Sequence, residues 1–128
     1  MVSFESFVQT DGVPIYVQII RHIKQAIVAG TVCDGDEMPS RRVLSALLGV
    51  NPNTVQKAYR MLEEEGLISS HSGAKSYISL SEEKMEAVRA ELMAGVVRTL
   101  VDAVRNMGVS REEALALVGK LWDEEVQA

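Results

Sequence analysis

Apolar side chains recur every three or four residues in three segments of the first half of the chain, at residues 14–30, 40–49 and 51–66. This spacing gives each segment one buried stripe and predicts three helices. Each segment begins with a residue that suits a helix N-terminus and ends at a glycine. The apolar positions are Ile15, Tyr16, Ile19, Ile20, Ile23 and Ile27 in the first helix, Val43, Leu44, Leu47 and Leu48 in the second, and Val55, Ala58, Tyr59 and Leu62 in the third.

Only a tight turn containing Gly49 separates the second and third predicted helices. Two short helices joined in this way form a helix-turn-helix, whose second helix enters the DNA major groove. Two strand candidates follow at residues 67–70 and 75–80, with Gly73 at the bend between them. Because a β-hairpin directly after a recognition helix is a wing, residues 13–80 are predicted to form a winged helix-turn-helix domain.

Helical spacing returns in the last part of the chain, residues 81–128. A long helix is predicted between the N-cap Ser81 and Gly108, and a shorter helix follows a capping box that begins at Ser110. Two such helices cannot cover their apolar surface against each other, so we expect a homodimer; folding back onto the winged helix is the alternative. The residues expected at the dimer contact are Met85, Val88, Leu92, Val96, Leu100, Val104, Leu115, Leu121 and Trp122.

The predicted fold is therefore mainly α with a small β-hairpin, a winged helix-turn-helix followed by a C-terminal helical hairpin. Residues 1–12 form an N-terminal arm before the winged helix, and residues 81–128 form a two-helix dimerisation tail. The arm contains Phe4, Phe7 and Val8. We expect these apolar side chains to dock the arm either on the first helix or on a partner subunit.

The third predicted helix combines its buried stripe with a polar face suited to nucleic acid. Its first two turns carry Asn53, Thr54, Gln56, Lys57 and Arg60, whose side chains can hydrogen-bond to base edges or phosphates. An ordinary solvated helix face is the alternative interpretation of the same residues.

The net charge of −5 argues against a broadly basic nucleic-acid binder, but the charges are unevenly distributed. Residues 11–80 carry seven basic and seven acidic side chains, whereas residues 81–128 carry six and ten. Residues 38–62 contain no acid, and a local positive window of this kind suits phosphates. The acidic run at residues 63–65 is expected to face away from DNA and to be solvated. The basic residues of the window are Arg41, Arg42, Lys57 and Arg60.

The segment 14–78 resembles the winged-helix domain of the GntR family of bacterial transcription regulators. The motifs that carry the resemblance are PIYVQI from Pro14, GDEMPSRR from Gly35, NPNTVQKAY from Asn51 and LEEEGLI from Leu62. The short two-helix tail is similar to that of the YtrA subfamily. The resemblance implies a dimeric DNA-binding regulator in a gene neighbourhood of membrane transporters.

The resemblance also implies roles for particular residues. The family's arginine at the second helix falls on Arg42, and its DNA-reading positions fall on residues 51–54 and 56. The wing departs from the family pattern, because Lys75 stands where a second glycine is usual. A glycine lets the backbone approach the minor groove closely, whereas Lys75 offers a phosphate contact. The residues expected at DNA are Ser40, Arg41, Arg42, Asn51, Asn53, Thr54, Gln56, Lys57, Arg60, His71, Gly73 and Lys75.

We expect a sequence-specific transcription regulator, a homodimeric repressor that binds a palindromic DNA operator. In a refinement of this interpretation, an unidentified small-molecule effector binds in the dimer cleft and regulates DNA binding. The alternative is a protein-interaction module that uses the winged helix and helical hairpin to bind a protein. The two differ in a measurable way, since operator binding would be salt-sensitive and the module would bind no defined DNA.

Other classes of function have little support in the sequence. No catalytic grouping stands out, so we expect no enzyme. His22 and His71 are the two histidines and lie far apart, so no metal and no cofactor are expected. Cys33 is the single cysteine, which fits a reducing cytoplasm. No apolar run approaches about 18 residues, so we expect a cytoplasmic protein without a membrane contact.

Overall fold

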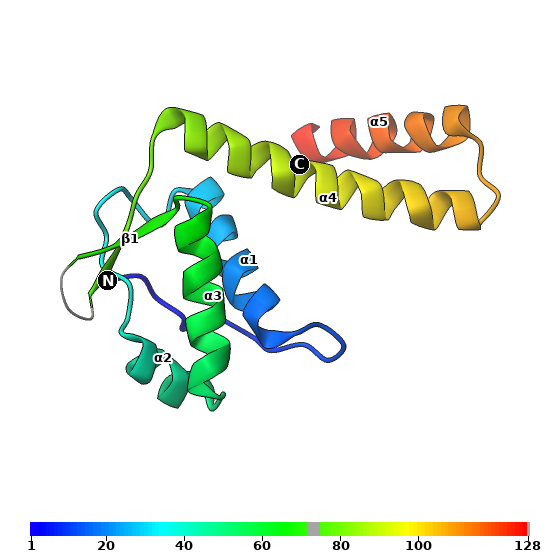
Figure 1. Cartoon of the computed structure of the whole chain (residues 1–128). Coiled ribbons are helices and arrows are strands. Elements are labelled where there is room, and N and C mark those ends of the chain that lie inside the picture. Colours follow the sequence, from blue (N-terminus) through cyan, green and yellow to red (C-terminus); the bar gives the residue numbers. More distant parts are fainter. Residues whose placement is uncertain (72–74, 128) are drawn as a thin grey trace. The chain divides into compact units, whose positions relative to one another are not determined.

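The structure is a computed structural model that describes residues 1–71 and 75–127, the last three as backbone alone. Two strands form one antiparallel pair, and the remaining elements are helices (Figure 1). The predicted fold class, mainly α with a small β-hairpin, is confirmed. The elements are α1 (Ile15–Ala29), α2 (Arg41–Leu48), α3 (Pro52–Glu64), β1 (Ile68–Ser70), β2 (Ser76–Ile78), α4 (Glu82–Asn106) and α5 (Arg111–Gln127).

The chain divides into two compact units, Met1–Ala90 and Glu91–Ala128. The division falls inside α4, later than the predicted start of the tail at residue 81. Val88 belongs to this first part of α4 and is buried, with 5% of its surface exposed. Because its side chain is already covered in a single copy, Val88 is not available to a partner as the sequence analysis expected.

The core of the first unit lies between α3 and the two helices that precede it. α1 and α2 both contact α3. Burying a side chain as large as Ile or Leu stabilises a fold by about 1.5–3 kcal/mol. This shared core therefore fixes α3 firmly on its two neighbours. Its fully buried members are Ile19, Ile23, Ile27, Leu44, Val55, Tyr59 and Leu62.

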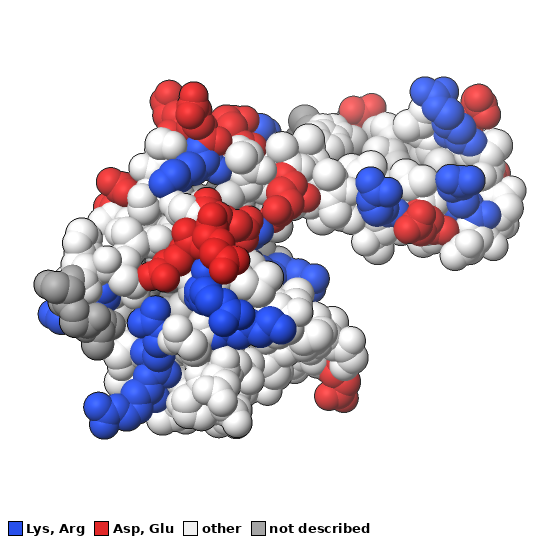
Figure 2. Space-filling model, viewed as in Figure 1, with Lys and Arg blue, Asp and Glu red and all other residues white. Residues whose placement is uncertain are grey.

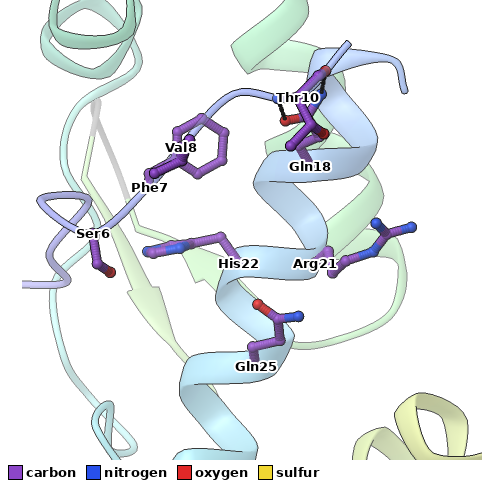
Figure 3. Close-up of a pocket in the computed structure, with 8 residues that line it drawn as sticks. All are labelled: Ser6, Phe7, Val8, Thr10, Gln18, Arg21, His22 and Gln25. Atoms are coloured by element: carbon purple, nitrogen blue, oxygen red, sulfur yellow. Dashed lines mark hydrogen bonds between the residues drawn. The ribbon is translucent and has the colours of Figure 1, made fainter. Parts of the chain in front are cut away.

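The N-terminal arm docks on α1, one of the two predicted positions. Val2 and Phe4 are buried, and the Phe4 ring stacks on the His22 ring with 4.5 Å between centroids. The Gln18 side chain donates to the carbonyl of Thr10 and accepts from its N–H, both at 2.9 Å (Figure 3). A groove of about 280 Å³ lies between arm and helix, and Thr10, Gln18 and His22 in its lining make these contacts.

The wing is tied to the segment that leads into α2. β1 and β2 pair along three residues each. Glu37 adds an antiparallel bridge to Tyr77, and the N–H of Met38 donates to the carbonyl of Ser76 at 2.9 Å. The sequence does not predict this bridge, because bridges between distant segments leave no local pattern. The wing and the start of α2 are thus held together.

The second unit contains the rest of α4 and all of α5. Gly108 adopts φ 74°, the left-handed conformation that ends a helix. Ser110 Oγ then accepts from the N–H of Glu113 at 3.1 Å, the N-terminal half of the predicted capping box. Figure 1 shows α5 turning back along α4 after this connection. Across the described residues, no helix has both the length and the apolar character needed to span a bilayer.

Candidate nucleic-acid interface

The N-terminus of α2 carries two adjacent cations. Arg41 and Arg42 occupy its first two positions, and its first turn has no acidic residue. Cations here oppose the helix dipole, at a cost of about 0.3–1 kcal/mol each, whereas the free N–H groups attract anions. Ser40 Oγ accepts from the N–H of Val43 at 3.1 Å, so this predicted DNA contact acts as the N-cap. The two arginines therefore destabilise α2 slightly, but their charges and the helix N–H groups together suit a phosphate.

A buried tyrosine supports this end of α2. The Tyr59 hydroxyl donates to the carbonyl of Pro39 at 2.6 Å, and the Arg41 guanidinium carbon lies 5.0 Å from the centroid of the Tyr59 ring. Burial raises the pKa of Tyr59 well above its ordinary value, although the positive charge of Arg41 opposes this. Tyr59 therefore remains a neutral donor that ties α2 to α3.

The recognition helix begins as the sequence predicts. Asn51 Oδ1 accepts from the N–H of Asn53 at 2.8 Å, so the Asn51 side chain is an N-cap as well as an expected DNA contact. Thr54 is half-buried, while Asn53 and Gln56 are exposed. The buried stripe on the opposite face holds the backbone from which these exposed amides project.

The two cations of α3, Lys57 and Arg60, are exposed and have different neighbours. Lys57 Nζ lies 4.0 Å from the centroid of the Tyr16 ring, which belongs to the first turn of α1. Arg60 Nε lies 3.9 Å from a carboxylate oxygen of Glu64, one turn further along the same helix. Lys57 thus has a neutral aromatic neighbour, whereas Arg60 has an acidic one.

The acidic run at the end of α3 is more than a solvated face, which corrects the expectation from sequence. Glu65 forms an ion pair of 2.9 Å with Lys24, whose side chain is only 9% exposed. Glu63 accepts a hydrogen bond from Ser70 of β1. Figure 2 shows Asp and Glu side chains gathered above the Lys and Arg side chains on this face. The carboxylates thus have partners within the protein, toward the end of α3 remote from Asn53 and Gln56.

The wing presents an exposed cation, Lys75, immediately before β2 at the loop end of the hairpin. The Lys75 side chain is 71% exposed, and its Nζ lies 3.4 Å from a carboxylate oxygen of Glu37. His71 is also exposed, and the edge of its ring meets Tyr77 with 5.3 Å between centroids. Gly73, the third residue expected at DNA in the wing, lies outside the described residues.

The tail exposes most of the apolar side chains expected at a dimer contact. Leu92 and Val104 are half-buried, whereas Trp122 is 71% exposed. Further exposed apolar residues on α4 and α5 were missed, because the sequence analysis followed a single stripe. The expected residues that are exposed are Met85, Val96, Leu100, Leu115, Leu121 and Trp122, and the additional ones include Met93, Val97, Val101 and Leu117.

Two neighbours of the cations expected at DNA were also missed by sequence reasoning. Tyr16 appeared only as part of an apolar stripe, and Glu37 only as a member of the motif GDEMPSRR. Glu37 had no local signal for this role, because its neighbour Lys75 lies far away in the sequence. Tyr16 had none either, because its neighbour Lys57 lies far away in the sequence.

Residues 15–78 match the family model described as bacterial regulatory proteins, gntR family. The chain belongs to the GntR family. It is 34% identical over 117 residues to the HTH-type transcriptional repressor YtrA of Bacillus subtilis (strain 168), covering 90% of this chain and 85% of that protein. The match to YtrA extends beyond the winged helix, as the predicted subfamily resemblance requires.

Solved structures agree with this assignment. A GntR family transcriptional regulator from Listeria monocytogenes superposes with a TM-score of 0.76 at 32% identity, covering 88% of this chain and 98% of that one. The structure of AraR(DBD) in complex with operator ORX1 matches with a TM-score of 0.50 at 25% identity, covering 56% of this chain and 92% of that one. This GntR protein is a DNA-binding transcription regulator and not an enzyme, as predicted.

Proposed function

We propose that this GntR regulator is a homodimeric repressor that binds a palindromic operator. The observation that carries the proposal is the exposed apolar surface of α4 and α5. Large apolar patches on a soluble protein mark contact surfaces. A second copy of the chain is the simplest occupant, because a two-fold contact places the same patch on both sides.

In this proposal, the exposed amides of α3 read the operator bases. Asn and Gln side chains can bond adenine through two hydrogen bonds in the major groove. Asn53 and Gln56 are exposed on the first turns of α3, where a recognition helix reaches base edges. Arg42, Lys57 and Lys75 contact phosphates on either side, which fixes the register of α3 on the duplex.

Selection of DNA from a random duplex library by the purified chain tests this function. We expect enrichment of an inverted repeat whose half-sites are centred about 10 base pairs apart, one turn of the helix. The matched control is the double variant Asn53→Ala/Gln56→Ala, which should lose the enriched sequence while remaining folded. A lone half-site, or no enrichment at all, would contradict the palindromic proposal and favour a protein partner.

The proposal extends to regulation by a small molecule and to the genes controlled. An unidentified effector would bind in the cleft of the dimer, and the exposed Trp122 supports an aromatic wall there. The resemblance to the YtrA subfamily supports the proposal that the regulated genes encode membrane transporters and lie nearby. Deletion of the regulator should raise transcripts of such flanking genes, and unchanged transcripts would contradict this part of the proposal.

A further inference from the structure

The neighbour of Lys57 distinguishes it from two other exposed cations on the proposed DNA face, Arg60 and Lys75. Its ammonium lies over the Tyr16 ring, at 4.0 Å from the centroid. Arg60 and Lys75 instead lie near the carboxylates of Glu64 and Glu37. A carboxylate cancels part of a cation's field and competes with phosphate, whereas a neutral ring leaves the full positive charge in place.

A ring below a lysine also restricts a side chain that is otherwise very flexible. Lysine has a four-carbon stem and loses substantial rotamer entropy when its ammonium is fixed. A cation near the face of an aromatic ring is attracted to the negative face of the ring. Tyr16 is half-buried at the start of α1, and α1 packs against α3, so the ring is itself held in place.

The same arrangement occurs a second time on this surface. Arg41 lies over the ring of the fully buried Tyr59, with 5.0 Å from the guanidinium carbon to the ring centroid. Two of the four cations in the acid-free window 38–62 are therefore placed over tyrosine rings. Tyr59 also fills the core, so its replacement would disturb packing. Tyr16 is the position at which the effect can be isolated.

We propose that Tyr16 is a positioning residue for DNA binding, whose ring holds the Lys57 ammonium in place for a phosphate. The proposal rests on the proposed function, because it requires Lys57 to meet DNA. Tyr16 acts through Lys57 and not through its own hydroxyl. The effect on affinity must therefore depend on the presence of the lysine.

A double-mutant cycle on the operator selected by the wild type tests this dependence. Tyr16→Leu should weaken binding about two- to fivefold when Lys57 is present, which corresponds to an exposed cation–π contact. In the Lys57→Gln background the same change should have no further effect. Tyr16→Phe, which keeps the ring, should bind like the wild type. The matched control is the Arg60→Gln background, in which Tyr16→Leu should still weaken DNA binding about two- to fivefold.

Each other outcome would overturn the proposal in an identifiable way. Equal effects of Tyr16→Leu with and without Lys57 would indicate general disturbance of α1, and melting curves of the variants would show it. Loss of affinity in Tyr16→Phe would assign the contact to the hydroxyl, and no effect of Tyr16→Leu would remove the residue from the interface. A wild type that selects no DNA would refute the proposed function itself, before any variant is compared.

Discussion

At the scale of single residues, Asn53 and Gln56 should determine which bases are preferred. Both are exposed on a helix whose other face is buried, so the backbone that carries their amides is held in place. Asn53→Ala or Gln56→Ala should relax the preference at one base pair of each half-site, by about 1–3 kcal/mol if a bidentate contact is lost. Competition binding against single-base operator variants measures this. Unchanged preference in both variants would remove them from base reading.

Lys75 should contribute charge without sequence preference. Its exposed ammonium lies near Glu37 in the free protein and can exchange that carboxylate for a phosphate. Lys75→Gln should weaken binding to all duplexes alike and reduce the slope of log affinity against log salt by about one. Arg98→Gln, in the tail, is the matched control and should leave the slope unchanged. If both variants keep the wild-type slope, Lys75 does not meet DNA.

Residue roles were predictable from sequence where they depend on near neighbours. The caps Ser40 and Asn51 act within three residues of themselves, so their motifs are visible in the chain. The partners of Lys57 and Lys75 are not visible in this way. Tyr16 and Glu37 reach them only after α1, α3 and the wing have packed together, and apolar periodicity does not specify such pairs.

At the scale of elements, Tyr59 of α3 holds Pro39, just before the start of α2, through one buried hydrogen bond. Tyr59→Phe removes the hydroxyl donor and leaves the buried carbonyl of Pro39 without a hydrogen bond from this side chain. The loss should lower the free energy of unfolding by about 1–3 kcal/mol. Chemical denaturation measures the loss. An unchanged free energy of unfolding would show that the bond does not tie the two helices together.

The same residue predicts how stability depends on pH. Burial raises the pKa of Tyr59 in the folded chain, so the folded state keeps its proton where the unfolded state loses it. This contribution to stability is complete below the unfolded pKa of about 10 and declines as the pH rises above it. Denaturation curves should therefore show a fall in stability above about pH 10 that is smaller in Tyr59→Phe. An equal fall in both proteins would contradict this.

The elements themselves were largely predictable, because local signals determine them. Helical spacing of apolar residues identified α1, α2 and α3, and glycines marked the helix ends. The bridge from Glu37 to Tyr77 could not be seen, since it joins segments far apart in sequence. In the tail, apolar residues occur around much of α4, so a single stripe such as that through Val96 and Leu100 described only part of the exposed surface.

At the scale of the whole molecule, assembly should depend on the exposed apolar surface of the tail. Leu100→Asp and Leu121→Asp should each disrupt the dimer, because an unpaired charge would be buried in the contact. Operator affinity should fall with assembly, since a single winged helix loses the second half-site. Thr99→Asp, an exposed polar position on α4, is the matched control. Loss of assembly in the control alone would place the contact elsewhere.

Sedimentation of the wild type at micromolar concentration, with and without the selected operator, tests the central claim most directly. The claim is that two copies of this chain bind one palindrome. The chain has a mass of 14.0 kDa. We expect a species of twice that mass in free solution and the same two copies on one operator duplex. A monomer that still binds the full palindrome tightly as a single copy would contradict the account.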